Sequence, residues 1–187
     1  SYGGQTTNVA GNSLNPCGSS SGSAVAVATG LVEVAIGTET NGSISCPASV
    51  NGVVGMKPTV GLVSRHGIVP IAASQDTAGP IGKDVAIVAR ALEAIAGPDG
   101  NDSATALIPA DFDFDLTEAA ANRTLRGKRF GLLTSGSEYP EAQALLRRIR
   151  QLVVGLGGEV VDIEDSRDYP SDESYRILLY EFSRGLE

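Results

Sequence analysis

The sequence predicts an α/β fold with a largely buried sheet. Short apolar runs, typical of buried strands, alternate along the chain with longer segments whose apolar residues recur at helical spacing. The chain has 187 residues, of which 42% are hydrophobic, and this is enough apolar material for one domain with a sizeable core. We therefore predict a single domain over residues 1–187.

The N-terminal part of the chain is predicted to begin as a loop and to continue as short elements. Its first residues are rich in Gly, Asn, Ser and Thr and lack an apolar period, which is typical of a loop. The segment that follows has only small side chains, so we predict a short, closely packed helix that ends at Gly30. The expected elements are a helix over 23–29, a strand over 31–36 interrupted by Glu33, a turn over 37–42, a helix over 43–50 with Pro47 in or before its first turn, and a strand over 53–56.

The C-terminal part contains clearer helical patterns. The strongest covers residues 83–96, where apolar residues repeat at helical spacing until Gly97-Pro98 ends the helix. The other expected elements are a long connector over 59–82, an acidic surface segment over 99–122, a strand over 130–133, a helix over 141–154, a strand over 159–163 and a helix over 171–186. We expect the apolar stripes of these helices to pack in the core.

Charge and length exclude several classes of partner. The net charge is −8 and the pI is about 4.6, so the chain has no basic footprint for nucleic acid and an anionic membrane would repel it. No apolar run is long enough to span a membrane. We predict no nucleic-acid or membrane partner, no metal or cofactor, and a cytoplasmic location.

The first residues, Ser1-Tyr2-Gly3-Gly4, are typical of a loop inside a protein, and the chain does not begin with Met. We therefore expect a fragment of a longer protein. Such a fragment would expose apolar sheet surface, and we expect it to associate with itself.

Ser43 is the strongest candidate nucleophile. It follows Asn41-Gly42, a pair that readily adopts unusual backbone angles and can aim consecutive N–H groups at one point, as an acyl-transfer oxyanion requires. A serine needs a base. A triad with His66, the only histidine, and Asp76 stays open on counting residues, although a surface loop is the favoured interpretation of His66. A second hydroxyl with a lysine behind it better suits the cluster of serines from Ser19 onward.

Two other patterns in this region give weaker indications of function. The glycine-flanked loop over 18–22 opens a small helix, but it lacks the Lys-Ser/Thr that a phosphate-binding P-loop needs after its second glycine. Cys17 and Cys46 could pair, but they form no disulfide framework, and a reducing compartment with two small buried side chains is the plainer interpretation.

The serine segments belong to long motifs that resemble a known family. Gly18-Ser19-Ser20-Ser21-Gly22-Ser23 resembles the first motif of the amidase signature family, and Gly37-Thr38-Glu39-Thr40-Asn41-Gly42-Ser43-Ile44-Ser45-Cys46-Pro47 resembles its second. The similarity continues through Gly52-Val53-Val54-Gly55-Met56-Lys57-Pro58-Thr59 and Ser74-Gln75-Asp76-Thr77-Ala78-Gly79-Pro80. Residues 1–96 carry the signature motifs, whereas 97–187 form a flanking α/β portion. Within the family, Pro16-Cys17 before the first motif, Glu39-Thr40 and Leu178-Leu179-Tyr180-Glu181-Phe182 look most like bacterial peptide amidases.

The resemblance implies a fold and a mechanism. The fold is a mixed, twisted sheet covered by helices, here in part. The implied activity is hydrolysis of a linear amide, either a C-terminal peptide amide or a small carboxamide, through Ser43 as nucleophile and Ser19 as a second serine that follows a cis peptide bond. The backbone N–H groups of Thr40, Asn41, Gly42 and Ser43 would form the oxyanion hole.

Departures from the family pattern bear on the activity. The family lysine precedes the cis serine and would lie before residue 1, whereas Lys57 follows the nucleophile and is read as a surface lysine, so the fragment alone is expected to be inactive. Many members have Gly or Asp where this chain has Asn41, and Arg where it has Ser45. These two departures mean that the resemblance alone does not define the substrate preference. The alternatives are a catalytically silent relative that binds amides or peptides, and a component of a tRNA-dependent amidotransferase.

Overall fold

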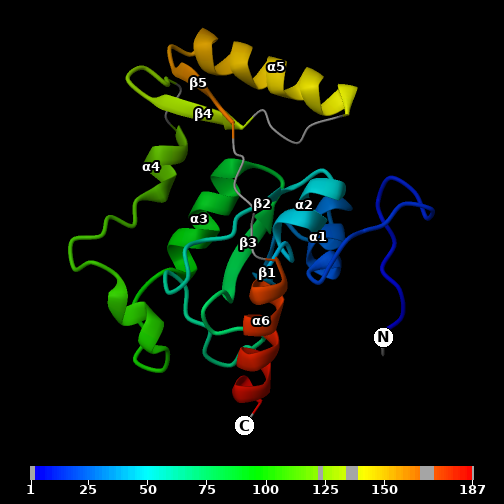
Figure 1. Cartoon of the computed structure of the whole chain (residues 1–187), viewed down its shortest axis with the longest axis vertical. Coiled ribbons are helices and arrows are strands. Elements are labelled where there is room, and N and C mark those ends of the chain that lie inside the picture. Colours follow the sequence, from blue (N-terminus) through cyan, green and yellow to red (C-terminus); the bar gives the residue numbers. More distant parts are fainter. Residues whose placement is uncertain (1–2, 122–123, 134–138, 165–170, 187) are drawn as a thin grey trace. The chain divides into compact units, whose positions relative to one another are not determined.

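The computed structural model describes residues 3–121, 124–133, 139–164 and 171–186 (Figure 1). The chain forms two compact units, one comprising Ser1–Ala121 with Asp172–Glu187 and the other Asn122–Ser171. Helices and sheets occur in both, which confirms the α/β class. The assignment of residues 1–187 to a single domain stays a prediction.

The first unit is built on an antiparallel sheet. Its strands are β1 (Val34–Glu39), β2 (Val54–Gly55) and β3 (Thr77–Gly82), in the order β1-β3-β2. All six residues of the central strand β3 are buried. The expectation of a largely buried sheet is confirmed for this strand.

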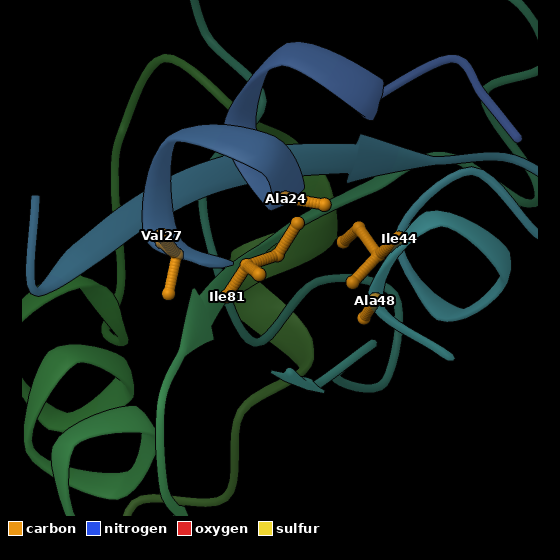
Figure 2. Close-up of a cluster of buried hydrophobic side chains, with 5 residues drawn as sticks. All are labelled: Ala24, Val27, Ile44, Ala48 and Ile81. Carbon is orange, nitrogen blue, oxygen red and sulfur yellow. The ribbon is translucent and has the colours of Figure 1, made fainter. Parts of the chain in front are cut away.

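Helices cover both faces of this sheet. Figure 1 shows α1 (Ser21–Ala28) and α2 (Ser45–Val50) on one side and α3 (Val85–Ile95) on the other. Successive residues of a strand point to opposite faces, so Ile81 and Ala78 of β3 serve different clusters. Ile81 packs with Ala24, Val27, Ile44 and Ala48 (Figure 2), whereas Ala78 packs with Val63 and Leu92. The first cluster joins α1 and α2, and each of these helices begins just after a serine of the predicted site.

The strand predicted over 31–36 and the turn predicted over 37–42 are displaced in the structure. β1 begins at Val34 and continues to Glu39, while Leu31 is 79% exposed. Strand β1 extends to Glu39 because it pairs with β3. The sequence predicted the long connector over 59–82 in place of β3, because Gly79 and Pro80 are typical of loops. In the sheet Gly79 lies opposite Gly37, and the Met56 N–H donates to the Pro80 carbonyl at 3.0 Å.

The segment over 99–122 is more than the surface segment that its acidic composition predicts. It contains the 3-10 helix η1 (Ser103–Leu107) and helix α4 (Leu116–Ala121), and Asp102 and Thr105 are buried. Its acidic residues are used locally, because the Asp102 carboxylate accepts from the Ala104 N–H at 3.1 Å and so begins η1. The first unit ends with α6 (Ser171–Gly185).

The second unit matches the prediction closely in its elements. It contains β4 (Arg129–Leu133), α5 (Pro140–Gly155) and β5 (Glu159–Ile163), and the strands pair in parallel.

The expected burial of the last apolar stripes is wrong in the structure. On α5, Val153 is buried, but Leu145 and Leu152 are 57% and 56% exposed, and α6 has no buried residue. The two-stranded sheet of the second unit covers only part of α5. The Glu181 carboxylate of α6 accepts a hydrogen bond from the Ser74 N–H of the connector at 2.9 Å. None of the helices described by the structure has the length and apolar character needed to cross a membrane.

Candidate active site

The structure brings the two serine segments together. The Ser20 N–H donates to the Ser43 carbonyl at 3.1 Å, and the Ser20 hydroxyl bridges the backbone of Thr38, accepting from its N–H and donating to its carbonyl at 3.1 Å each. Ser20 is buried, because Gly37 has no side chain to occupy its place: a Cβ on Gly37 would lie 2.8 Å from the Ser20 hydroxyl oxygen. The segments that hold Ser19 and Ser43 are therefore fixed to each other through Ser20.

The candidate relay serine, Ser19, is exposed and follows a cis peptide bond from Gly18, the geometry that the resemblance implies. The candidate nucleophile, Ser43, is half-buried in the turn between β1 and α2. The turn is tight, because Gly42 has a φ of 84° and its carbonyl accepts from the Cys46 N–H at 2.8 Å. The other proposed oxyanion residues, Thr40 and Asn41, lie on this turn just after β1.

The Glu39 side chain holds the Ser43 turn through hydrogen bonds to its carboxylate. The buried carboxylate accepts from the backbone N–H groups of Ile44 and Ser45 through Oε2, at 2.8 Å each, and from the Ser45 hydroxyl at 3.1 Å. Burial raises the pKa of Glu39, but the hydrogen bonds from Ser45, Ile44 and Gly42 outweigh it, and the net pKa lies below its ordinary value. A charged Glu39 thus fixes the backbone on both sides of Ser43.

Asp76 holds the other end of the turn. Its Oδ1 accepts a short hydrogen bond from the Thr40 hydroxyl, and its Oδ2 accepts from the N–H groups of Ile71 and Ala72 at 2.8 and 2.9 Å. A cavity of about 220 Å³ opens beside Asp76, and Arg65, His66, Asn101 and Asp102 also line it. Asp76 is therefore engaged with Thr40, and not in place behind a catalytic histidine.

In the part of the chain that the structure describes, neither of the two alternative bases, His66 and Lys57, is hydrogen-bonded to Ser43. His66 is exposed in the connector, in agreement with a surface histidine, and it helps to lower the pKa of Asp99, whose main partner is the Ser64 hydroxyl. Lys57 is exposed and donates to the Pro58 carbonyl at 3.4 Å, as expected for a surface lysine.

Arg65 and Asp102, which line this cavity, form an ion pair. The Asp102 carboxylate accepts from Nη2 and Nε of Arg65 at 2.8 Å each and from the Arg65 backbone N–H at 2.9 Å. These hydrogen bonds, with Arg65 foremost, overcome burial and hold the pKa of Asp102 far below its usual range. The pair fastens the connector that carries Asp76 to the loop before η1.

The expectation of two separate, buried cysteine side chains is wrong. Cys17 and Cys46 form a disulfide with a Cα–Cα distance of 5.9 Å, and both residues are only half-buried. The loop before Ser19 and the first turn of α2 meet, and this places the sulfurs within bonding distance.

Sequence reasoning missed the supporting roles of Glu39, Ser20 and Asp76. A signal for Glu39 was present, since a carboxylate placed shortly before a helix start is suited to accept N–H groups of the first turn. Nothing local indicates that the Ser20 hydroxyl binds Thr38 or that Asp76 binds Thr40, because both contacts join segments that are distant in sequence.

The family model that matches the chain is named Amidase, and the match covers residues 1–187. The chain belongs to the amidase family. Among curated proteins it is 57% identical over 177 residues to a glutamyl-tRNA(Gln) amidotransferase subunit of Symbiobacterium thermophilum, covering 91% of this chain and 35% of that protein. It is 48% identical over 131 residues to a putative amidase of Arthroderma benhamiae, covering 70% of this chain and 22% of that protein.

Solved structures agree with this assignment. The native peptide amidase from Stenotrophomonas maltophilia superposes with a TM-score of 0.88 at 50% identity, over 98% of this chain and 38% of that one. The crystal structure of PAM12A superposes with a TM-score of 0.93 at 52% identity, with the same coverage. The amidase chain therefore has the signature fold in part, and it spans well under half the length of these relatives.

Proposed function

We propose that the full-length protein that contains this chain is an amidase that hydrolyses a linear carboxamide to a carboxylate and ammonia. The observation that carries the proposal is the hydrogen bond from the Ser20 N–H to the Ser43 carbonyl, which ties the Ser19 loop to the Ser43 turn. Membership of the amidase family supports the reaction class.

In the proposed mechanism the Ser43 hydroxyl oxygen attacks the amide carbonyl carbon. Its proton passes to the Ser19 hydroxyl, whose own proton passes to a neutral lysine supplied by a part of the protein outside this chain. The oxyanion accepts hydrogen bonds from the backbone N–H groups of Thr40, Asn41 and Ser43. The Gly42 N–H, which the family resemblance also assigns to the oxyanion hole, donates to the Glu39 carboxylate instead. The proton then returns to the leaving nitrogen, ammonia departs, and water hydrolyses the Ser43 ester to regenerate the hydroxyl.

Glu39 and Asp76 support this role without touching the substrate. Glu39 uses the Ile44 and Ser45 N–H groups, which follow the nucleophile, and Asp76 takes the Thr40 hydroxyl, which precedes it. The backbone N–H groups of Thr40, Asn41 and Ser43 lie on the turn between the Asp76 contact and the Glu39 contacts, and in this proposal they are available to the oxyanion. We propose a carboxamide at the end of a peptide as the substrate, because the peptide amidase of Stenotrophomonas maltophilia superposes on 98% of this chain with a TM-score of 0.88.

The test is ammonia release from a C-terminal peptide amide by the full-length protein. Ser43→Ala should lower kcat/KM by on the order of 10⁶-fold, and Ser19→Ala should cause a large loss as well. Ser49→Ala, on the exposed side of α2, serves as the matched control and should retain activity. Turnover that persists in Ser43→Ala would reject Ser43 as nucleophile, and binding without turnover in the unaltered protein would identify a silent relative.

A second candidate function rests on the identity of 57% to a glutamyl-tRNA(Gln) amidotransferase component. In that case the full-length protein would release ammonia for use by a partner protein, and would not hydrolyse a peptide amide as its own reaction. Comparing free glutamine with a C-terminal peptide amide separates the two functions. Preference for glutamine, increased when a partner complex is present, would favour the amidotransferase role.

A further inference from the structure

The disulfide joins the two segments of the proposed active site. Cys17 directly precedes the Gly18-Ser19 peptide, and Cys46 lies in the first turn of α2, which follows Ser43. The bridge spans a sequence separation of 29 residues, and α1 and β1 lie between its ends. It is therefore a direct covalent link between the loop of the relay serine and the turn of the nucleophile.

Ser19 is held from both sides by this link and by Ser20. On its C-terminal side, Ser20 binds the Ser43 carbonyl and the backbone of Thr38. On its N-terminal side, the disulfide ties Cys17 to α2. The relay requires the Ser19 hydroxyl within hydrogen-bond reach of the Ser43 hydroxyl, so both restraints act on the distance that matters for proton transfer.

Weaker contacts also hold the loop before Cys17. The Asn51 side chain donates to the Pro16 carbonyl at 3.2 Å, and the Asn8 side chain donates to the Asn15 carbonyl at 3.0 Å. Loss of the disulfide would therefore loosen the loop without detaching it. This predicts a reduced rate in a protein that stays folded.

We propose that the Cys17–Cys46 disulfide is a redox-sensitive positioning element of this active site. In the oxidised state it holds Ser19 against the Ser43 turn, and reduction by a dithiol lowers the rate of the proposed amide hydrolysis. The inference rests on the proposed function. A dithiol thiolate attacks one sulfur of the bridge to give a mixed disulfide, and its second thiol resolves this bond. The products are the Cys17 and Cys46 thiols and the oxidised, cyclic form of the dithiol, in a two-electron exchange.

The test measures ammonia release from a C-terminal peptide amide by the full-length protein before and after anaerobic treatment with dithiothreitol. Alkylation and mass spectrometry verify that Cys17 and Cys46 are reduced. We expect kcat to fall by about 10-fold, because small misplacement of a catalytic group costs this much or more, with KM changed far less. Reoxidation should restore the rate.

The double substitution Cys17→Ala with Cys46→Ala controls for other thiols of the protein. Its kcat should equal that of the reduced protein and should not respond to dithiothreitol. Full activity after verified reduction would overturn the inference while the proposed function stands. Loss of far-UV circular dichroism on reduction would also overturn it, because the bridge would then serve global stability. An inactive oxidised protein would reject the proposed function and the inference together.

Discussion

The Glu39 carboxylate accepts a hydrogen bond from the Ile44 backbone N–H at 2.8 Å, and Ile44 is the residue that follows the proposed nucleophile. The same oxygen accepts from the Ser45 N–H, so one buried carboxylate fixes the backbone immediately after Ser43. Ile44 in turn packs on Ile81 of the central strand. The direction of the Ser43 turn is therefore set by the end of β1 and by the core beneath it.

Replacing Glu39 by Gln should lower the rate of the full-length protein with little change in KM. The amide keeps the shape of the side chain but presents one acceptor oxygen without charge, so the turn after Ser43 is held less firmly. We expect kcat to fall on the order of 10-fold and the free energy of unfolding by about 1–2 kcal/mol. Steady-state kinetics and thermal melts measure the two effects.

Glu33→Gln is the matched control for Glu39, because Glu33 is exposed and precedes β1. It should leave both kcat and the melting temperature unchanged. A folded Glu39→Gln protein with the kcat of the unaltered enzyme would contradict the positioning role.

Ser20→Ala should weaken the contact between the two serine segments. The substitution removes the hydroxyl that satisfies both the N–H and the carbonyl of Thr38 in a buried site, at a cost of about 1–3 kcal/mol in the free energy of unfolding. Chemical denaturation of the full-length protein measures this cost, and the rate of amide hydrolysis measures the effect on Ser19.

Ser23 offers the control for Ser20, because it lies in the first turn of α1, just after Ser20, and its hydroxyl donates to the Ile36 carbonyl at 2.8 Å in a more exposed position. Ser23→Ala should cost well under ~1 kcal/mol, since water can replace the lost partner. Equal losses for the two variants would contradict the importance given to burial of Ser20.

Asp102 should make stability depend on acid pH. Its pKa is lower in the folded protein than in the unfolded chain, so its contribution is fully present above about pH 4 and is lost as the pH falls toward the lower folded value. Asp102→Asn removes the charge opposite Arg65 and should cost about 3 kcal/mol at neutral pH. Denaturation midpoints between about pH 3 and about pH 7 should therefore vary less in this variant than in the unaltered protein.

Asp111→Asn, at an exposed position, is the control for Asp102 and should retain the pH dependence of the unaltered protein. A steep loss of stability in acid that persists in Asp102→Asn would assign the effect to other carboxyl groups.

The chain of 187 residues by itself should associate. Helix α6 exposes Tyr175, Leu179 and Phe182, which are 61%, 48% and 39% accessible, and apolar surface of this kind favours contact between copies. Sedimentation velocity at increasing concentration should show species larger than a monomer. Leu179→Lys should reduce them more than Asp172→Lys does, and a monomer at all concentrations would contradict the prediction.

Local sequence patterns determined several helices, the family and the candidate site residues of this chain. The periodicity of α3 and α5 predicted both helices to within a few residues, because apolar residues that recur at helical spacing over a segment of this length favour a helix. The two serine motifs predicted the family and the candidate residues of the site. The cis peptide at Gly18-Ser19 was expected through that resemblance alone.

Only the tertiary structure decided how the site is held together. β3 carries Gly79 and Pro80, which locally favour a loop, and pairing with β1 outweighed that preference. The contacts of Ser20 with Thr38, Asp76 with Thr40 and Cys17 with Cys46 join residues that local sequence does not relate. A sequence pattern reports the preference of a segment for its own conformation, whereas these contacts depend on which distant segments the folded core brings within bonding distance.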